Sequence, residues 1–109
     1  MKWLMLVVFL TPGLAFADPA TERLWKGKCA GCHGADGKGA TEQGKKMHVS
    51  DMSTAEWQKE ATDEKITAAI NDGIKTEKNG VKQEMDAYKA KLKPEQIAAL
   101  AAHVRTLKK

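Results

Sequence analysis

Cys29-Ala30-Gly31-Cys32-His33 is the stretch around which the rest of this 109-residue chain is arranged. Two thiols separated by two residues, with a histidine directly after the second, form the attachment signature of a c-type haem. Each thiol can form a thioether with a haem vinyl group, and the imidazole then lies close enough to bind the iron. A short turn with small residues at positions 30 and 31 would bring these groups to one flat ligand. The motif therefore predicts one covalently bound haem.

Three other uses of a C-x-x-C pair fit this chain less well. A thioredoxin-like redox pair would lie beside a βαβ pattern, which the sequence lacks. A structural zinc site needs four ligands, and there is no second half-site. A disulfide between Cys29 and Cys32 would close too small a loop to stabilise the fold much. Haem attachment is the interpretation that accounts for the histidine as well.

The first 17 residues have the pattern of a cleaved secretory signal peptide. Lys2 supplies the charged start, residues 3–10 are an unbroken apolar run, and Ala15-Phe16-Ala17 matches the small-x-small cleavage pattern. The apolar run is much shorter than the roughly 20 residues that a spanning helix needs. We therefore expect residues 18–109 to form one exported domain without a membrane span, in the periplasm, where thiols and haem can meet.

The composition of residues 18–109 favours a domain that depends on a cofactor. These 92 residues carry 17 basic and 14 acidic side chains, and the lysines are interleaved with acidic residues, which argues against nucleic-acid binding. The aromatic residues are few, namely Trp25, Trp57 and Tyr88. A small domain with so few large apolar groups usually needs a metal, a cofactor or disulfides.

The predicted elements are helices separated by loops. A short helix is expected over 21–28, another opens at the capping box Ser53-Thr54-Ala55-Glu56, and a third runs from Thr62 to a stop at Gly73. The last helix begins at Pro94 and repeats apolar residues at helical spacing. Residues 34–44 are expected as a loop, and so are residues 74–84, with a turn at Asn79-Gly80. No strand pattern is evident, so the predicted fold class is all-α.

Two stretches of the chain resemble the small bacterial type of class I cytochrome c. The first is Cys29-Ala30-Gly31-Cys32-His33-Gly34-Ala35-Asp36-Gly37-Lys38-Gly39, and the second is Met85-Asp86-Ala87-Tyr88 followed by Leu92-Lys93-Pro94-Glu95-Gln96-Ile97-Ala98-Ala99-Leu100. The resemblance spans essentially all of residues 18–109. It implies about four short helices and loops wrapped around one haem, with the final helix packed across the first.

The resemblance also implies a role for each site residue. Cys29 and Cys32 would form the thioethers, His33 would be the proximal iron ligand and Met85 the distal one. A thioether is a soft, neutral ligand that favours ferrous iron, so a His/Met pair raises the reduction potential.

Other residues compete with Met85 for the distal position. Met47 and Met52 also carry thioethers, and His48 would give bis-histidine iron with a lower potential. The residues themselves leave these alternatives open, because methionine is more often a packing residue than a ligand. His103, in the final helix, is expected to contact Trp25.

Two positions depart from the family pattern. Asp86 follows the methionine where a proline is common. No proline lies between Pro19 and Pro94, so a backbone carbonyl other than the family's proline carbonyl would have to orient His33.

The function that the resemblance implies is one-electron transfer in a respiratory or other periplasmic chain, with iron cycling between Fe(III) and Fe(II) in a protein that is not an enzyme. We expect a monomer whose lysines surround the exposed haem edge and attract an acidic redox partner, namely Lys28, Lys38, Lys45, Lys46, Lys82, Lys89 and Lys91. The alternatives are a haem subunit permanently docked on a dehydrogenase or oxidase, and a haem sensor or enzyme with an open or bis-histidine iron site.

Overall fold

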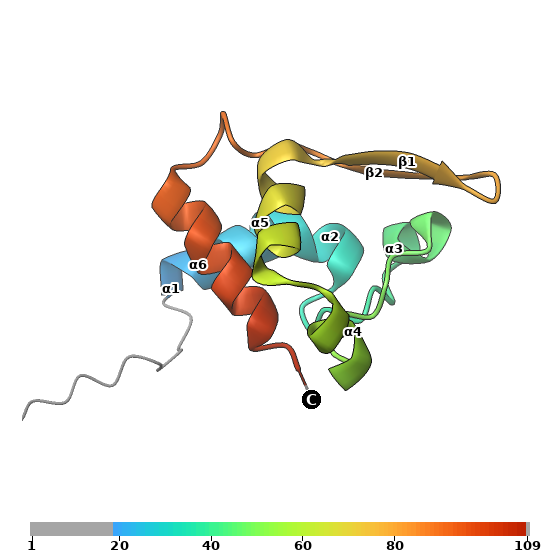
Figure 1. Ribbon diagram of the computed structural model, residues 1–109, viewed down its shortest axis with the longest axis horizontal. Helices are drawn as coiled ribbons and strands as arrows, with labels where there is room; N and C mark the ends of the chain where they lie inside the picture. The colour runs from blue at the N-terminus through green and yellow to red at the C-terminus, as the bar shows by residue number, and fades with distance from the viewer. Residues whose placement is uncertain (1–18, 109) are drawn as a thin grey trace, which may run out of the picture.

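The computed structural model describes residues 19–108, and the expected signal peptide at residues 1–17 lies outside this range. The described elements, in chain order, are α1 (Pro19–Leu24), the π-helical segment η1 (Trp25–Cys29), α2 (Ala30–His33), α3 (Glu42–Met47), α4 (Ala55–Glu60), α5 (Asp63–Asp72), β1 (Ile74–Lys78), β2 (Val81–Met85) and α6 (Pro94–Arg105). The fold is therefore mostly helical, with one small antiparallel sheet (Figure 1).

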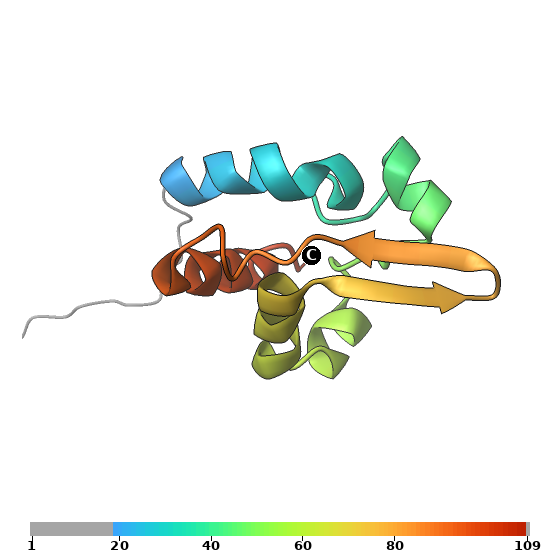
Figure 2. The ribbon, with the colours of Figure 1, turned by 90° about the horizontal axis from the view of Figure 1, so that it is seen from above.

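The N-terminal helical run is longer than the sequence indicates. α1, η1 and α2 follow one another without a break, as Figure 2 shows from above. We predicted a helix over 21–28 followed by a short turn for the haem motif, and this boundary was wrong. Gly31 lies on the exposed side of the run, where a missing side chain costs little packing, and the run ends instead at Gly34, whose φ is 84°.

The predicted loop at 34–44 is a loop only in its first part. Thr41 caps α3, and its hydroxyl accepts a hydrogen bond from the backbone N–H of Gly44. The Thr41 hydroxyl also donates to the carbonyl of Cys32 at 2.8 Å. This one side chain therefore begins α3 and joins it to the haem motif.

Residues 74–85 form a β-hairpin, so the prediction of a polar loop without strands was wrong. The strands pair antiparallel from Ile74 opposite Met85 to Lys78 opposite Val81. The expected Asn79-Gly80 turn is present, and both residues have positive φ, 52° and 80°. That conformation is the one required by a two-residue hairpin loop whose twist matches the strands.

The remaining helices begin at the position that their capping residues predict or one residue after it. Thr62 caps α5, which ends before Gly73, and Pro94 is the first residue of α6. α4 begins one residue later than a capping box at Ser53 would place it, because Thr54 is the cap. Ser53 instead donates both its N–H and its hydroxyl to the carboxylate of Asp51.

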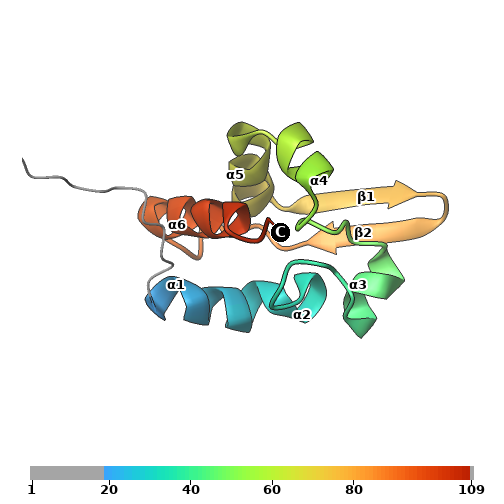
Figure 3. The same ribbon diagram turned by 90° about the horizontal axis from the view of Figure 1, so that it is seen from below.

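The elements form three layers around the haem motif. Figures 2 and 3 show the α1–η1–α2 run on one side and α4 with α5 on the other, while α6 and the hairpin lie between them. The residues buried in the core come from every layer, and they are Trp25, Cys29, Met52, Ile66, Ile70, Tyr88, Ile97, Leu100, Val104 and Leu107. All of these residues except Ile97 and Leu107 also line one large cavity. The core therefore forms the wall of that cavity.

Candidate functional site

The haem motif presents its three functional side chains to the cavity. Cys29 ends η1, and Cys32 and His33 end α2. Residues three and four positions apart lie on the same face of a helix, so the spacing of the motif brings both sulfurs and the imidazole to one side. Cys29 is buried, Cys32 and His33 are half-buried, both thiols are free, and all three residues line the cavity.

Burial shifts the acid–base behaviour of two of these groups. Desolvation raises the pKa of the Cys29 thiol to about 11, and the nearby positive charge of Lys28 offsets this only in part. Desolvation also lowers the pKa of His33, so its imidazole is neutral at neutral pH and keeps a lone pair for a metal ion. Burial therefore favours the uncharged form of both groups, the protonated thiol of Cys29 and the neutral imidazole of His33.

Trp25 packs beside the imidazole of His33, and sequence analysis did not assign it to the site. The two ring centroids are 5.9 Å apart, and the Trp25 indole N–H donates to the carbonyl of Gly34 at 3.1 Å. The Nδ1 atom of His33 is buried and makes no hydrogen bond within residues 19–108. In the described part of the chain, then, contact with Trp25 orients the imidazole, and the expected carbonyl acceptor is not present.

The cavity has a volume of about 520 Å³ and mostly apolar walls. Ligand pockets in proteins commonly have volumes of about 300–1,000 Å³. Its walls come from the motif helix, from α5 through Ile66 and Ile70, from α6 through Leu100 and Val104, and from the hairpin. A flat apolar cofactor attached to the two thiols would fill this space, and we therefore find that the residues present fit a haem.

The structure separates the candidate distal ligands into two groups. Met85 ends β2, Met47 ends α3 and Met52 follows in the loop, and all three line the cavity with His33. Met85 and Met47 are half-buried, and Met52 is 7% exposed. His48 is exposed, does not line the cavity, and adopts the left-handed conformation that ends α3.

Tyr88 joins the segment after Met85 to the haem motif. Its hydroxyl donates to the carbonyl of Lys28 at 3.3 Å, and its backbone N–H donates to Ile70 at 2.9 Å. Burial raises the pKa of Tyr88, and the negative charge of Asp86 adds to the shift. The phenol is therefore neutral at neutral pH and able to donate this hydrogen bond.

The lysines expected around the haem edge are all exposed, but they differ in their contacts. Among the seven, Lys28 lines the cavity, whereas Lys89 pairs with Asp72 at 3.5 Å and Lys91 pairs with Asp86 at 3.9 Å. Exposed ion pairs of this kind contribute little to stability. One further lysine, Lys65 on α5, also lines the cavity and was not predicted.

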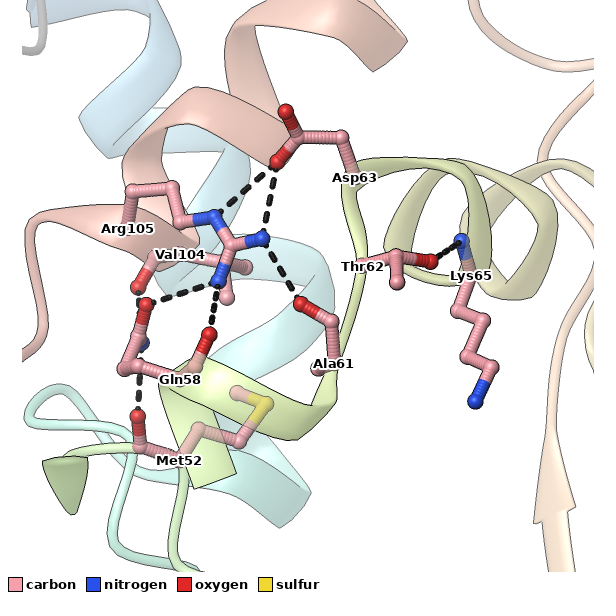
Figure 4. Close-up of polar contacts among 8 residues, drawn as sticks. All are labelled: Met52, Gln58, Ala61, Thr62, Asp63, Lys65, Val104 and Arg105. Atoms are coloured by element: carbon pink, nitrogen blue, oxygen red, sulfur yellow. Dashed lines mark hydrogen bonds and ion pairs between the residues drawn. The ribbon is translucent and has the colours of Figure 1, made fainter. Parts of the chain in front are cut away.

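A polar network on the far side of the cavity also escaped sequence analysis. Figure 4 shows the guanidinium of Arg105 between α4 and α5. Its five N–H groups donate to the carbonyl and side-chain oxygen of Gln58, to the carbonyl of Ala61, and twice to one carboxylate oxygen of Asp63, at 2.7–3.0 Å. This arrangement fixes the end of α6 against the corner between two other helices.

Gln58 extends that network to the cavity wall. Its side-chain amide donates to the carbonyl of Met52 at 2.8 Å and to that of Val104 at 2.9 Å, and both of these residues line the cavity. Figure 4 shows the side chain of Met52 beneath the network. The network thus holds two walls of the cavity at a fixed separation.

Within residues 19–108 there is no group of three or more His, Cys, Asp or Glu side chains that would hold a metal ion by itself. Over the same residues, no helix has the length and apolar character needed to cross a membrane.

Comparisons with known proteins point to one family. The family model for cytochrome c matches residues 20–108. The solved structure of KustC0563, a c-type cytochrome, is 35% identical, with a TM-score of 0.67 over 82% of this chain and 98% of that one. A tyrosine-to-phenylalanine mutant of the same cytochrome is 33% identical, with a TM-score of 0.64 over 81% of this chain and 98% of that one. No curated protein matched.

These matches cover nearly all of the described residues, and they confirm the predicted fold together with haem c as the cofactor of its family. Members of that family are electron carriers and not enzymes. Because they carry electrons, they act with redox partners. The chain belongs to the cytochrome c family.

Proposed function

We propose that this cytochrome is a one-electron carrier with His33 and Met85 as axial iron ligands and with haem bound through Cys29 and Cys32. One observation carries the proposal: a single cavity collects both thiols, the imidazole of the motif and the thioether of Met85, while His48 lies outside it. Bound haem supplies an iron that accepts and releases one electron. The protein holds this cofactor and adjusts its potential.

The chain's own groups account for that adjustment. His33 is kept neutral by burial and is held in place by Trp25. A neutral thioether from Met85 favours the reduced iron and so raises the potential. Apolar side chains such as Ile66, Leu100 and Val104 exclude water from the cavity, which limits solvent reorganisation when the charge changes.

Met85 is favoured over Met47 by the element that carries it. Met85 ends β2, where it lies opposite Ile74 of β1, and the backbone N–H groups of Tyr88 and Lys89 donate to carbonyls of α5. Met47 ends a six-residue helix whose last turn is followed directly by the exposed His48. A ligand needs a defined position, and the segment around Met85 is held both by β1 and by the end of α5.

The location and the partner complete the proposal. Residues 1–17 would direct export to the periplasm and would then be removed. Lys28 and Lys65 at the cavity would help to attract an acidic redox partner. Protein sequencing of the exported product, which should begin at Asp18, checks the first point. The partner interaction should weaken as salt is added, because charge attraction is screened.

The test of the ligand assignment is the absorption spectrum of the holoprotein and of single alanine variants. We expect wild type to show low-spin c-type haem with the weak long-wavelength iron–sulfur charge-transfer band. Met85→Ala should lose this band and lower the reduction potential, whereas Met47→Ala and His48→Ala should keep both properties. Carbon monoxide should bind the reduced Met85→Ala variant and not wild type. Loss of the band in Met47→Ala instead would make Met47 the ligand, and binding of carbon monoxide to wild type would indicate an open site.

A further inference from the structure

The segment that ends in Met85 is contacted closely on its α5 side by Gly73. Gly73 has a φ of +74°, and a Cβ built on it would overlap the carbonyl oxygen of Met85 and lie 2.9 Å from the backbone nitrogen of Ala87. No side chain larger than hydrogen fits there unless the backbone around Met85 moves. Gly73 thus sets how closely this backbone approaches the end of α5.

The same segment is held on its α3 side by Gln83. The Gln83 amide nitrogen donates to the carbonyl of Met47 at 2.8 Å and to the carbonyl of His48 at 3.1 Å. Gln83 and Met85 are two residues apart on β2, so they lie on the same face of the strand, and both line the cavity. The hydrogen bonds of Gln83 therefore act directly on the strand face that carries the thioether.

The hairpin has little apolar packing that would hold it otherwise. All five residues of β1 are exposed, and β2 alternates between half-buried and exposed positions. Its contacts with the helices at the two sides of Met85 thus become important for the position of the sulfur. A ligand group must be held within roughly 0.5 Å of its productive position to be effective.

We propose that Gly73 and Gln83 are positioning residues for the Met85 thioether, Gly73 by permitting close backbone approach and Gln83 by hydrogen bonding the ligand-bearing strand to α3. This inference rests on the proposed role of Met85 as the distal ligand. Neither residue touches the iron in this proposal. Each acts through the backbone of β2.

The first test compares Gly73→Ala with Gly80→Ala in the holoprotein. The two glycines have similar positive φ values, +74° and +80°, but a Cβ on Gly80 meets nothing within 4 Å. Both variants therefore carry similar backbone strain, and only Gly73→Ala pushes on Met85. We expect Gly73→Ala to lose most of the iron–sulfur band and to have a lower potential, with covalent haem and helix content retained, while Gly80→Ala resembles wild type. Equal bands and potentials in the two variants would overturn the role of Gly73.

The second test does not depend on whether Gly73→Ala folds. Gln83→Glu keeps the shape of the side chain but removes the N–H donor. Gln96→Glu makes the same change in α6, at a residue that does not line the cavity and whose retained oxygen still accepts from the Lys93 N–H. Imidazole competes with the methionine sulfur for ferric iron. We expect Gln83→Glu to bind imidazole about tenfold more tightly than wild type, equivalent to about 1.4 kcal/mol, and Gln96→Glu to bind it as wild type does. Equal affinities in the two glutamate variants would overturn the role of Gln83.

The Met85→Ala spectrum separates failure of this inference from failure of the proposed function. If wild type lacks the band, or if Met85→Ala keeps it, the ligand assignment is wrong and the positioning roles are wrong with it. If Met85→Ala loses the band but Gly73→Ala and Gln83→Glu match their controls, Met85 remains the ligand and only the positioning roles are wrong.

Discussion

His103 places an ionisable ring between the first and last helices. Its centroid lies 4.9 Å from that of Trp25, which confirms the contact expected from sequence. Both ring nitrogens are buried and have no hydrogen-bond partner in the described part of the chain. Desolvation lowers the pKa of His103, and the negative charge of Glu22 opposes that shift. The helix contact is therefore built around a neutral imidazole.

Acidification should destabilise the folded holoprotein, because His103 becomes protonated more readily in the unfolded chain. The unfolded chain takes up the proton near pH 6.5 and the folded chain only at a lower pH, so the unfolded state binds more protons between these two values. The free energy of unfolding should fall as the pH drops through this window, and the contribution is fully present above it. Guanidinium unfolding above and below pH 6.5 should show a smaller loss for His103→Phe than for wild type. Glu22→Gln should enlarge the loss, and identical losses in wild type and His103→Phe would contradict the assignment.

At the scale of elements, the corner between α4 and α5 depends on one residue from α6. Arg105 satisfies the carbonyls of Gln58 and Ala61 at the point where the backbone leaves one helix and enters the next. The planar guanidinium reaches these acceptors together, which a lysine ammonium on a flexible stem would not do. Arg105 thus does for this corner what capping residues do for single helices.

Arg105→Lys should lower the free energy of unfolding by about 1–3 kcal/mol, because partly buried carbonyls lose their donors. Asp63→Asn should cost less than about 1 kcal/mol, since the Asp63 side chain is 81% exposed and its ion pair is screened by water. Chemical denaturation of both variants gives the comparison. A larger effect for Asp63→Asn would show that the ion pair, and not the carbonyl hydrogen bonds, holds the corner.

The elements that sequence predicted well are those with local signals. Thr62 and Gly73 mark the two ends of α5, and Pro94 begins α6, because capping and proline geometry depend on a few neighbouring residues. The hairpin was missed although Asn79-Gly80 is a strong hairpin signal. Its strands alternate lysine and glutamate with few apolar residues, so they lack the apolar face by which strands are usually recognised.

The site was predictable to the extent that it lies in one motif. Cys29, Cys32 and His33 are adjacent in sequence, so their meeting in one cavity could be expected. Contacts between distant segments could not, such as that of Gln83 with Met47 across 36 positions. The spacing of residues in the sequence also could not exclude His48 as a ligand. Its exposure follows from its own left-handed backbone conformation at the end of α3.

At the scale of the whole molecule, the protein is a shell around its cofactor. Nearly all of its buried apolar residues line the cavity of about 520 Å³. Without a cofactor these apolar walls would face water, and their burial is the main favourable term in folding. The total stability of a small domain is about 5–15 kcal/mol. The polypeptide alone therefore does not have the interactions needed to keep this shape.

A chain that cannot attach haem should consequently lose its cooperative fold. In Cys29→Ser/Cys32→Ser, far-ultraviolet circular dichroism should show much less helix than in the holoprotein, and heating should give no sharp transition. The wild-type holoprotein serves as the folded reference. Native helix content with a sharp transition in the haem-free double variant would show that the polypeptide fills the cavity itself.

The turn of the hairpin offers a place at which the molecule can be attached to a surface. Its strands are five residues long, so its turn lies about 14 Å from the Met85 end at about 3.4 Å per residue, and space around Gly80 is open. A short peptide carrying one reactive thiol, inserted between Asn79 and Gly80, would stand clear of the helices. Molecules tethered to gold through that thiol would all be held by the same end. Their electrode kinetics would then report on a single orientation of the redox centre.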